Sequence, residues 1–155
     1  MDNQTKAKLT KGFIEAMPFC AALKMRVDEI GNGLAEISMP FSADLVGDPK
    51  RGIIHGGAVS ALMDTCGGAA AICHPKAGES SATINLRIDY MRAARPGETV
   101  IASAHCYKVT RHVAFVRGVA HDGDQDDPVA MSQATFMTTS SEAHPMQKFM
   151  SGSAS

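Results

Sequence analysis

A segment from about residue 57 to residue 73 is apolar on nearly every side and is rich in alanine, leucine and methionine. A single carboxylate, Asp64, interrupts it, and the run His-Pro-Lys-Ala-Gly at 74–78 ends it. A helix without a polar face has to be buried all round rather than laid on a surface. Because Asp64 keeps the apolar run shorter than the eighteen residues of a membrane span, we expect a buried helix and no membrane segment.

Most of the remaining chain alternates polar and apolar residues, which is typical of a half-buried antiparallel sheet. A Gly-Asn-Gly sequence at 31–33 predicts a hairpin, and Pro18 predicts the end of an amphipathic N-terminal helix. The predicted elements are a helix at 4–16, strands at 22–30 and 34–40, a loop at 41–52, the long helix, and strands at 81–93, 99–120 (with a break near 110) and 128–139. This order predicts an α+β fold in which one long central helix is wrapped by an antiparallel sheet of five to six strands.

The chain's 155 residues suit one domain with a substantial core. We divide it into an N-terminal helix and lead-in (1–19), the α+β domain (20–140) and a polar, serine-rich tail (141–155) that we expect to be disordered. One sheet covers only one side of the central helix. We therefore expect another copy of the chain to supply the second surface.

Composition excludes several functional classes. A net charge of −1 lacks the basic footprint of a nucleic-acid-binding protein. The first residues lack the layout of a secretory signal, and the four cysteines are scattered without a CxxC pair, so we expect reduced thiols and a cytoplasmic protein. Cys66 and Cys73 share a helical face, but no further ligand falls near them, and we expect neither a metal nor a cofactor.

The start of the central helix carries the strongest chemical signal. The sequence His55-Gly56-Gly57 opens the helix, and a helix N-terminus offers unpaired N–H groups and the positive end of a dipole, which stabilise anions. Asp64 is costly to bury on an apolar helix and calls for an explanation. Together these residues suggest a reaction that generates an oxyanion and needs a base.

The spacing of Gly57 and Asp64 bears on how they can cooperate. Seven residues place them on nearly the same helical face but about 10 Å apart along the axis, whereas a catalytic acid has to lie within about 3 Å of the group it serves. Two antiparallel helices related by a two-fold axis bring Gly57 of one chain opposite Asp64 of the other. We therefore predict an obligate homodimer with two composite sites, which can pair further into a dimer of dimers.

The arrangement of elements, the triplet at 55–57 followed by Asp64, and the run Asp-Tyr-Met-Arg-Ala-Ala-Arg-Pro-Gly-Glu at 89–98 resemble the hotdog-fold acyl-CoA thioesterases. The nearest subgroup is the phenylacetate-degradation and 4-hydroxybenzoyl-CoA type, and the resemblance covers about residues 20–140. It implies hydrolysis of acyl-CoA, with a medium-chain or aromatic acyl group, to the free acid and CoA. It also implies that Gly57 N–H donates to the thioester carbonyl and that Asp64 is the base or the nucleophile.

The resemblance assigns further roles. Gly56 allows close approach of the substrate to the backbone, and Thr83 stands where relatives often carry a Ser or Thr that faces the catalytic acid. Close relatives often carry an Asn or Gln about six residues before the histidine, where this chain has Pro49. The chain therefore departs from the family pattern at this position, because proline lacks the side-chain amide that would be a second donor to the thioester.

Coenzyme A carries phosphates, which favour arginine and lysine. Arg92, Arg95 and Arg111 lie near turns after the central helix, and we take them as candidates for binding the CoA nucleotide. Basic residues at strand ends are, however, commonly no more than solvated side chains.

Structural interpretations stay open for several of these residues. A Ser60 or Thr65 hydroxyl can satisfy Asp64, and His55 can cap or order the loop, the role we favour over direct chemistry. The acidic run at 122–127 departs from the pattern of a calcium loop and is interpreted as a solvated hairpin turn. Two other functions remain possible: a hotdog dehydratase or hydratase, and a non-catalytic acyl-CoA binding module.

Overall fold

The computed structural model describes residues 2–139. Its helices and strands follow one another in nearly the order that the sequence pattern predicts. They are, in chain order, α1 (Asn3–Ala16), α2 (Pro18–Ala22), β1 (Arg26–Gly31), β2 (Leu34–Met39), the 3-10 turn η1 (Ala43–Leu45), β3 (Val46–Asp48), β4 (Ile53–Ile54), α3 (Gly56–Ile72), β5 (Ser80–Tyr90), β6 (Val100–Val109), β7 (Val113–His121) and β8 (Ala130–Thr139).

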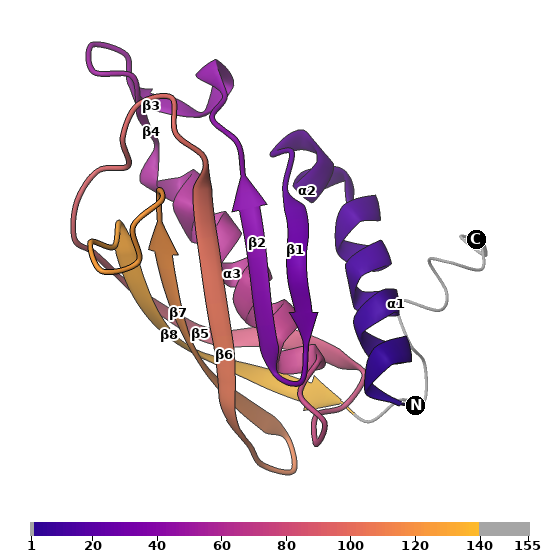
Figure 1. Ribbon diagram of the computed structural model, residues 1–155. Helices are drawn as coiled ribbons and strands as arrows, with labels where there is room; N and C mark the ends of the chain where they lie inside the picture. Colours follow the sequence, from indigo (N-terminus) through magenta and orange to yellow (C-terminus); the bar gives the residue numbers. More distant parts are fainter. Residues whose placement is uncertain (1, 140–155) are drawn as a thin grey trace.

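Six strands form one antiparallel sheet in the order β1-β2-β6-β7-β8-β5. The long helix α3 crosses one face of this sheet, and α1 lies beside β1 at one edge (Figure 1). The opposite edge is β5, which pairs with β8 alone within residues 2–139. The α+β prediction, with one central helix wrapped by an antiparallel sheet, is confirmed, and the architecture is the hotdog fold.

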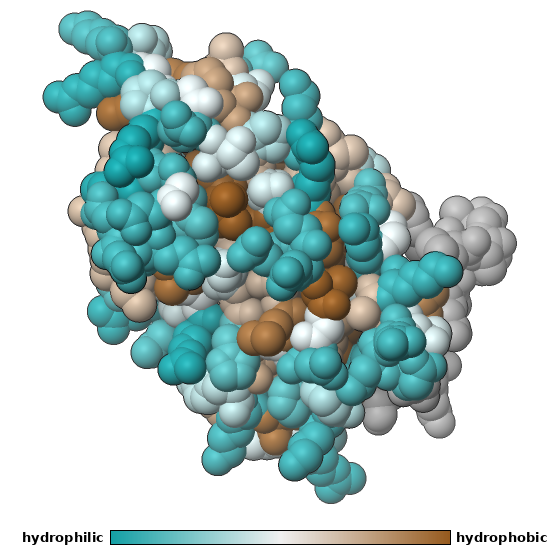
Figure 2. Space-filling view, viewed as in Figure 1, coloured by the Kyte–Doolittle hydropathy of each residue, from teal (hydrophilic) through white to brown (hydrophobic). Residues whose placement is uncertain are grey.

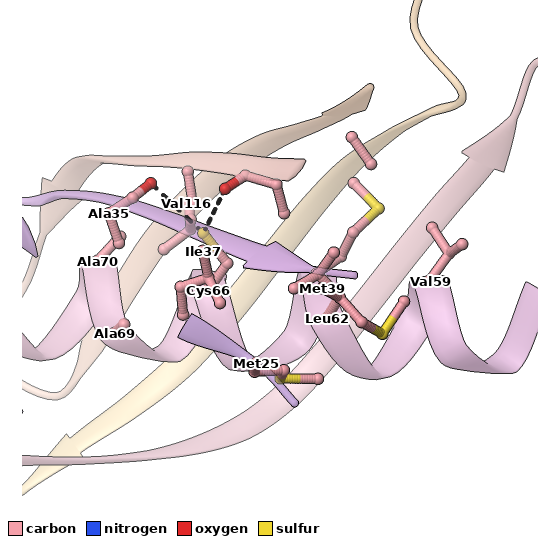
Figure 3. Close-up of a cluster of buried hydrophobic side chains, with 14 of the residues drawn as sticks. Met25, Ala35, Ile37, Met39, Val59, Leu62, Cys66, Ala69, Ala70 and Val116 are labelled. Carbon is pink, nitrogen blue, oxygen red and sulfur yellow. Dashed lines mark hydrogen bonds between the residues drawn. The ribbon is translucent and has the colours of Figure 1, made fainter. Parts of the chain in front are cut away.

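The core lies between α3 and the sheet. Figure 3 shows Leu62 and Cys66 of α3 against Ile37 and Met39 of β2, all fully buried. The Cys66 thiol donates to backbone carbonyls of β2 and β6, and burial raises its pKa to about 12, so it is a neutral core group. This packing fixes the helix, and therefore Asp64, on the sheet.

The N-terminal helices border one flank of α3: α1 packs against β1 and contacts α3, and side chains of α1 and α2 line a cavity beside α3. Lys6 of α1 is buried, and its Nζ donates to the carbonyls of His74 (3.2 Å) and Ala77 (2.8 Å), just beyond the end of α3. A cation at this position also interacts favourably with the negative end of the helix dipole. Part of the second surface, which the sequence analysis assigned to another copy, therefore comes from the same chain.

The N-terminal hairpin begins later than predicted. The residues from 22 to 25 end α2 and form a turn in which Lys24 has φ +54°, so the strand starts at Arg26 rather than at residue 22. The predicted turn at 31–33 is confirmed, with φ of +52° at Asn32 and +82° at Gly33. Only Gly, Asn and Asp take such angles readily, which is why this tripeptide is a strong hairpin signal.

The predicted loop at 41–52 is partly ordered as η1 and β3, and β3 pairs with β4 in a small second sheet. This hairpin places residue 47 against His55, because a Cβ at Gly47 would lie 2.9 Å from the His55 Cα. The predicted disordered tail at 141–155 lies outside the described residues.

The outer face of the sheet turns away from α3. Figure 2 shows hydrophobic residues gathered along the middle of this face. Leu34 and Met131 are exposed and line a groove on it. This groove measures about 630 Å³ and also has Arg87 and Arg117 in its lining. Neither the triplet at 55–57 nor Asp64 borders this groove. Among the described residues, no helix combines the length and hydrophobicity that a membrane crossing requires.

Candidate active site

His55 is the N-cap of α3. Its backbone is extended (φ −62°, ψ 134°), and its Nδ1 accepts a hydrogen bond from Gly57 N at 2.9 Å. The ring thus satisfies one of the donors that a helix start leaves unpaired. The structure therefore gives His55 the capping role, and it occupies Gly57 N–H with a neutral ring nitrogen at an exposed helix tip.

The carbonyl of the Gly56–Gly57 peptide is also held. The Tyr90 hydroxyl, at the end of β5, donates to Gly56 O at 2.7 Å, and the Ser60 hydroxyl lies 3.2 Å from the same oxygen. The two hydroxyls also bond to each other. Sequence reasoning missed Tyr90, although this residue is part of the run quoted at 89–98. Only the packing of α3 against β5 brings Tyr90 to the start of the helix.

Asp64 lies about two turns beyond Gly57 along α3 and is half-buried. Its Oδ1 accepts a hydrogen bond from the Thr83 hydroxyl of β5 at 2.9 Å. The local partners considered from the sequence are engaged elsewhere: the Ser60 hydroxyl lies within hydrogen-bond distance of Gly56 O and Tyr90 Oη, and Thr65 donates to Ala61 O at 2.8 Å. The structure thus pairs Asp64 with Thr83, as the family resemblance implies, and leaves Oδ2 without a hydrogen-bond partner among the described residues.

Two cavities open beside α3. Asp64 and Thr83 border one of about 420 Å³, whose other walls are mostly apolar side chains of α1, α2 and α3. His55 and Gly57 border a second cavity of about 400 Å³. Phe19 and Ala61 line both, whereas Asp64 lines only the first and Gly57 only the second. The two groups expected to act on one carbonyl therefore face different cavities of the same chain.

Arg92 has a structural role. Its guanidinium makes two hydrogen bonds with Asp122, of 2.9 and 2.6 Å, and a third with the carbonyl of Asp127. Asp122 has a side chain with no exposed area, so the interpretation of 122–127 as a solvated turn is wrong for this residue. The guanidinium of Arg92 holds the pKa of the Asp122 carboxyl well below its usual range. Binding a CoA phosphate would compete with this buried ion pair.

The other basic candidates are more accessible. Arg95 donates its backbone N–H to Asp122 at 2.7 Å. Its side chain is 56% exposed, and its guanidinium lies 3.9 Å from the Asp122 carboxylate and 3.8 Å from that of Asp127. Arg111 is exposed in the β6–β7 turn. This end of the sheet lies at the C-terminal end of α3, because Gly33 accepts a hydrogen bond from Cys106 N in β6 and donates one to the carbonyl of Cys73, the α3 C-cap. Arg111 therefore lies at the opposite end of α3 from Gly57.

Pro49, which stands where the family resemblance implies an amide side chain, lies in a turn that Asp48 closes. The Asp48 carboxylate accepts hydrogen bonds from the backbone of Lys50 (3.1 Å) and Arg51 (3.3 Å), which closes the turn around Pro49.

Within residues 2–139, no three His, Cys, Asp or Glu side chains are grouped to hold a metal ion.

Comparison with known proteins agrees with this geometry. Residues 51–129 match the model of the thioesterase superfamily. Medium/long-chain acyl-CoA thioesterase YigI of Escherichia coli (strain K12) is 28% identical over 138 residues, covering 81% of this chain and 88% of YigI.

Solved structures show the same architecture. A Pseudomonas aeruginosa protein superposes with a TM-score of 0.77 at 34% identity and covers 86% of this chain and 99% of its own. The E. coli PaaI protein from the phenylacetic acid degradation operon, at 19% identity, superposes with a TM-score of 0.77 over 89% of this chain and 96% of its own, which bears on the fold alone. These matches confirm the resemblance drawn from residues 55–57, 64 and 89–98. The chain is an enzyme and belongs to the thioesterase superfamily.

Proposed function

We propose that this enzyme hydrolyses acyl-CoA thioesters to the free acid and CoA, with Asp64 as the general base. Asp64 takes a proton from water, the water oxygen attacks the thioester carbonyl carbon, and the carbonyl oxygen becomes an oxyanion that accepts from Gly57 N–H. The C–S bond then breaks, and the departing thiolate takes the proton from Asp64. The observation that carries this proposal is the half-buried Asp64, oriented by Thr83 at the border of an apolar cavity.

The proposed site is composite. Gly57 and Asp64 of one chain face different cavities, so a second copy is needed to bring the two groups to one carbonyl. β5 is suited to this, since it is an edge strand with an open row of backbone groups and exposed apolar residues such as Ile84 (57% exposed). Antiparallel pairing of β5 with its copy, about a two-fold axis, would set the two α3 helices side by side and antiparallel.

The shape of the Asp64 cavity supports a medium-length acyl group. Its lining follows α3 from Asp64 to Ile72, a distance of about 12 Å along the helix axis. Phe13 of α1 and Met17, which links α1 to α2, close it from the other side, and Phe136 of β8 lies in its wall. An extended apolar chain can lie in this space with its carbonyl near Asp64. The exposed side chains of Arg95 and Arg111 are the remaining candidates for the CoA phosphates.

His55 also constrains the mechanism. A thioester carbonyl that binds Gly57 N–H has to share or replace the bond to His55 Nδ1. Because this cap is a single hydrogen bond between neutral groups at an exposed helix end, exchanging it for a developing oxyanion is favourable.

The test is turnover of a panel of acyl-CoA esters, from short to long chain and including aromatic acyl groups, followed by the release of free thiol. We expect hydrolysis with a maximum at medium chain length, and loss of turnover with retained acyl-CoA binding in Asp64→Asn and Asp64→Ala. Binding without turnover in the unmodified protein would instead identify a binding module. Consumption of an enoyl-CoA by hydration, with no thiol released, would identify a hydratase.

A further inference from the structure

We infer that Tyr90 is a positioning residue that strengthens the Gly57 N–H donor through the carbonyl of the same peptide unit. The inference rests on the proposed function, in which Gly57 N–H binds the oxyanion. The carbonyl of Gly56 and the N–H of Gly57 belong to one conjugated peptide group. A hydrogen bond to that carbonyl draws electron density toward its oxygen and makes the N–H more acidic, as in any hydrogen-bonded chain.

Proton counting limits how the three oxygen atoms around Gly56 O can share hydrogen bonds. Tyr90 Oη, Ser60 Oγ and Gly56 O lie within hydrogen-bond distance of one another, but the two hydroxyls have only one proton each. Both cannot donate to Gly56 O while also bonding to each other. The shorter contact, 2.7 Å, is that of the Tyr90 phenol, which is also the more acidic hydroxyl. Two arrangements meet this count, and we assign the one in which the shorter contact to Gly56 O carries the proton: Ser60 O–H to Tyr90 O, Tyr90 O–H to Gly56 O, and Gly57 N–H to its acceptor.

The same contacts fix the geometry. The Tyr90 ring stands against Gly56, where a Cβ would lie 3.5 Å from ring atoms. Tyr90 is the last residue of β5, and Thr83, which orients Asp64, belongs to the same strand. One edge strand therefore holds both halves of the chemistry, the amide donor through Tyr90 and the base through Thr83.

The experiment compares Tyr90→Phe with Ser60→Ala and with a matched control, Tyr107→Phe. Tyr107 is equally exposed (51% against 50%), but its ring contacts Phe115 and Arg117 instead of α3. Removing an oxyanion donor outright costs 10²–10³ in kcat, so weakening one through Tyr90→Phe should lower kcat by about tenfold with KM nearly unchanged. Ser60→Ala removes only the outer link and should lower kcat by about threefold, and Tyr107→Phe should leave kcat unchanged.

A second readout does not depend on turnover. A donor on the Gly56 carbonyl deshields the amide nitrogen of Gly57, so its ¹⁵N resonance should move upfield in Tyr90→Phe and stay in place in Tyr107→Phe. An unmoved Gly57 resonance, or a Tyr90→Phe enzyme with the unmodified kcat, overturns the inference. If the unmodified protein turns over no acyl-CoA, the proposed function fails, and the Gly57 resonance still decides whether Tyr90 polarises this peptide.

Discussion

Asp64 and Asp122 both point inward, but their surroundings differ in almost every respect. Asp122 is fully buried, and its two oxygens accept hydrogen bonds from the Arg92 guanidinium and from the backbone N–H of Arg95. Asp64 is half-buried, has one neutral hydroxyl as its partner, and borders a cavity. No ion pair to Asp64 occurs among the described residues, whereas Asp122 and Asp127 share two arginines.

This difference separates a carboxylate that stabilises the fold from one suited to chemistry. A base has to be reached by substrate and has to accept a proton. Asp122 satisfies neither condition, because it is inaccessible and the arginines hold the pKa of its carboxyl far below neutrality. Asp64 keeps one oxygen without a partner at the border of a cavity. Surroundings, rather than residue type, assign the roles.

The largest expected effect is on activity at Asp64. Asp64→Asn keeps the shape of the side chain but removes the base, so kcat should fall by about 10³-fold. Its unfolding free energy should stay within about 0.5 kcal/mol of the unmodified protein, since no buried ion pair is broken. Steady-state kinetics and urea denaturation check the two parts. A variant with more than a tenth of the original kcat would remove Asp64 from the chemistry.

The next largest effect is on stability at Asp122. Asp122→Asn leaves Arg92, which is 23% exposed, with only the exposed Asp127 as a charge partner, and the unfolding free energy should fall by about 2 kcal/mol. The kcat of the folded fraction should stay unchanged. Urea denaturation of Asp122→Asn and of Asp64→Asn compares the unfolding free energies of the two variants. Equal stability of the two variants would contradict the distinction drawn between these carboxylates.

A smaller effect is expected at Thr83. Thr83→Val keeps the volume but removes the hydroxyl that orients Asp64, and kcat should fall by about tenfold. Thr83→Ser restores a hydroxyl and should recover most of the activity. If serine and valine at this position behave alike, the hydrogen bond to Asp64 does not contribute to catalysis.

The smallest expected effect is the dependence of the unfolding free energy on acid pH. The pKa of Asp122 is lower in the folded chain than its ordinary value of 3.8, so the unfolded chain binds more protons in acid. The stabilisation is complete above about pH 4 and is lost as pH falls toward the folded-state pKa. Unfolding free energies between pH 6 and pH 3 should fall more steeply in the unmodified protein than in Asp122→Asn. Parallel curves would assign the acid sensitivity to other groups.

The fold was largely predictable because its signals are local. The apolar helix, the Gly-Asn-Gly turn and the alternating strands each depend on a few neighbouring residues, and α3 was placed to within one residue at each end. Residues 22–25 were misassigned to a strand, because their apolar side chains fit either structure and Lys24 adopts a left-handed turn conformation that its residue type does not announce.

The site was only partly predictable because its contacts join distant segments. The pairing of Asp64 with Thr83 came from family resemblance, and the capping by His55 from its place before a helix. Tyr90 reaches Gly56 across 34 positions, and Arg92 reaches Asp122 across 30. Such contacts depend on the register of the strands, which no local pattern specifies. An acidic run that looks solvated in sequence can therefore contain a buried ion pair.

The central claim, that each site combines Gly57 of one chain with Asp64 of another, is tested most directly by mixing two inactive variants. Gly57→Pro removes the N–H in the first turn of α3, where the helix tolerates proline but the His55 ring, 2.9 Å from a Cβ at this position, has to turn aside. Asp64→Asn removes the base. Unfolding and refolding them together in equal amounts should restore about a quarter of the unmodified activity, because half of the dimers are mixed and each has one intact site. If the mixture stays as inactive as its components although mixed dimers form, Gly57 and Asp64 do not act across the interface.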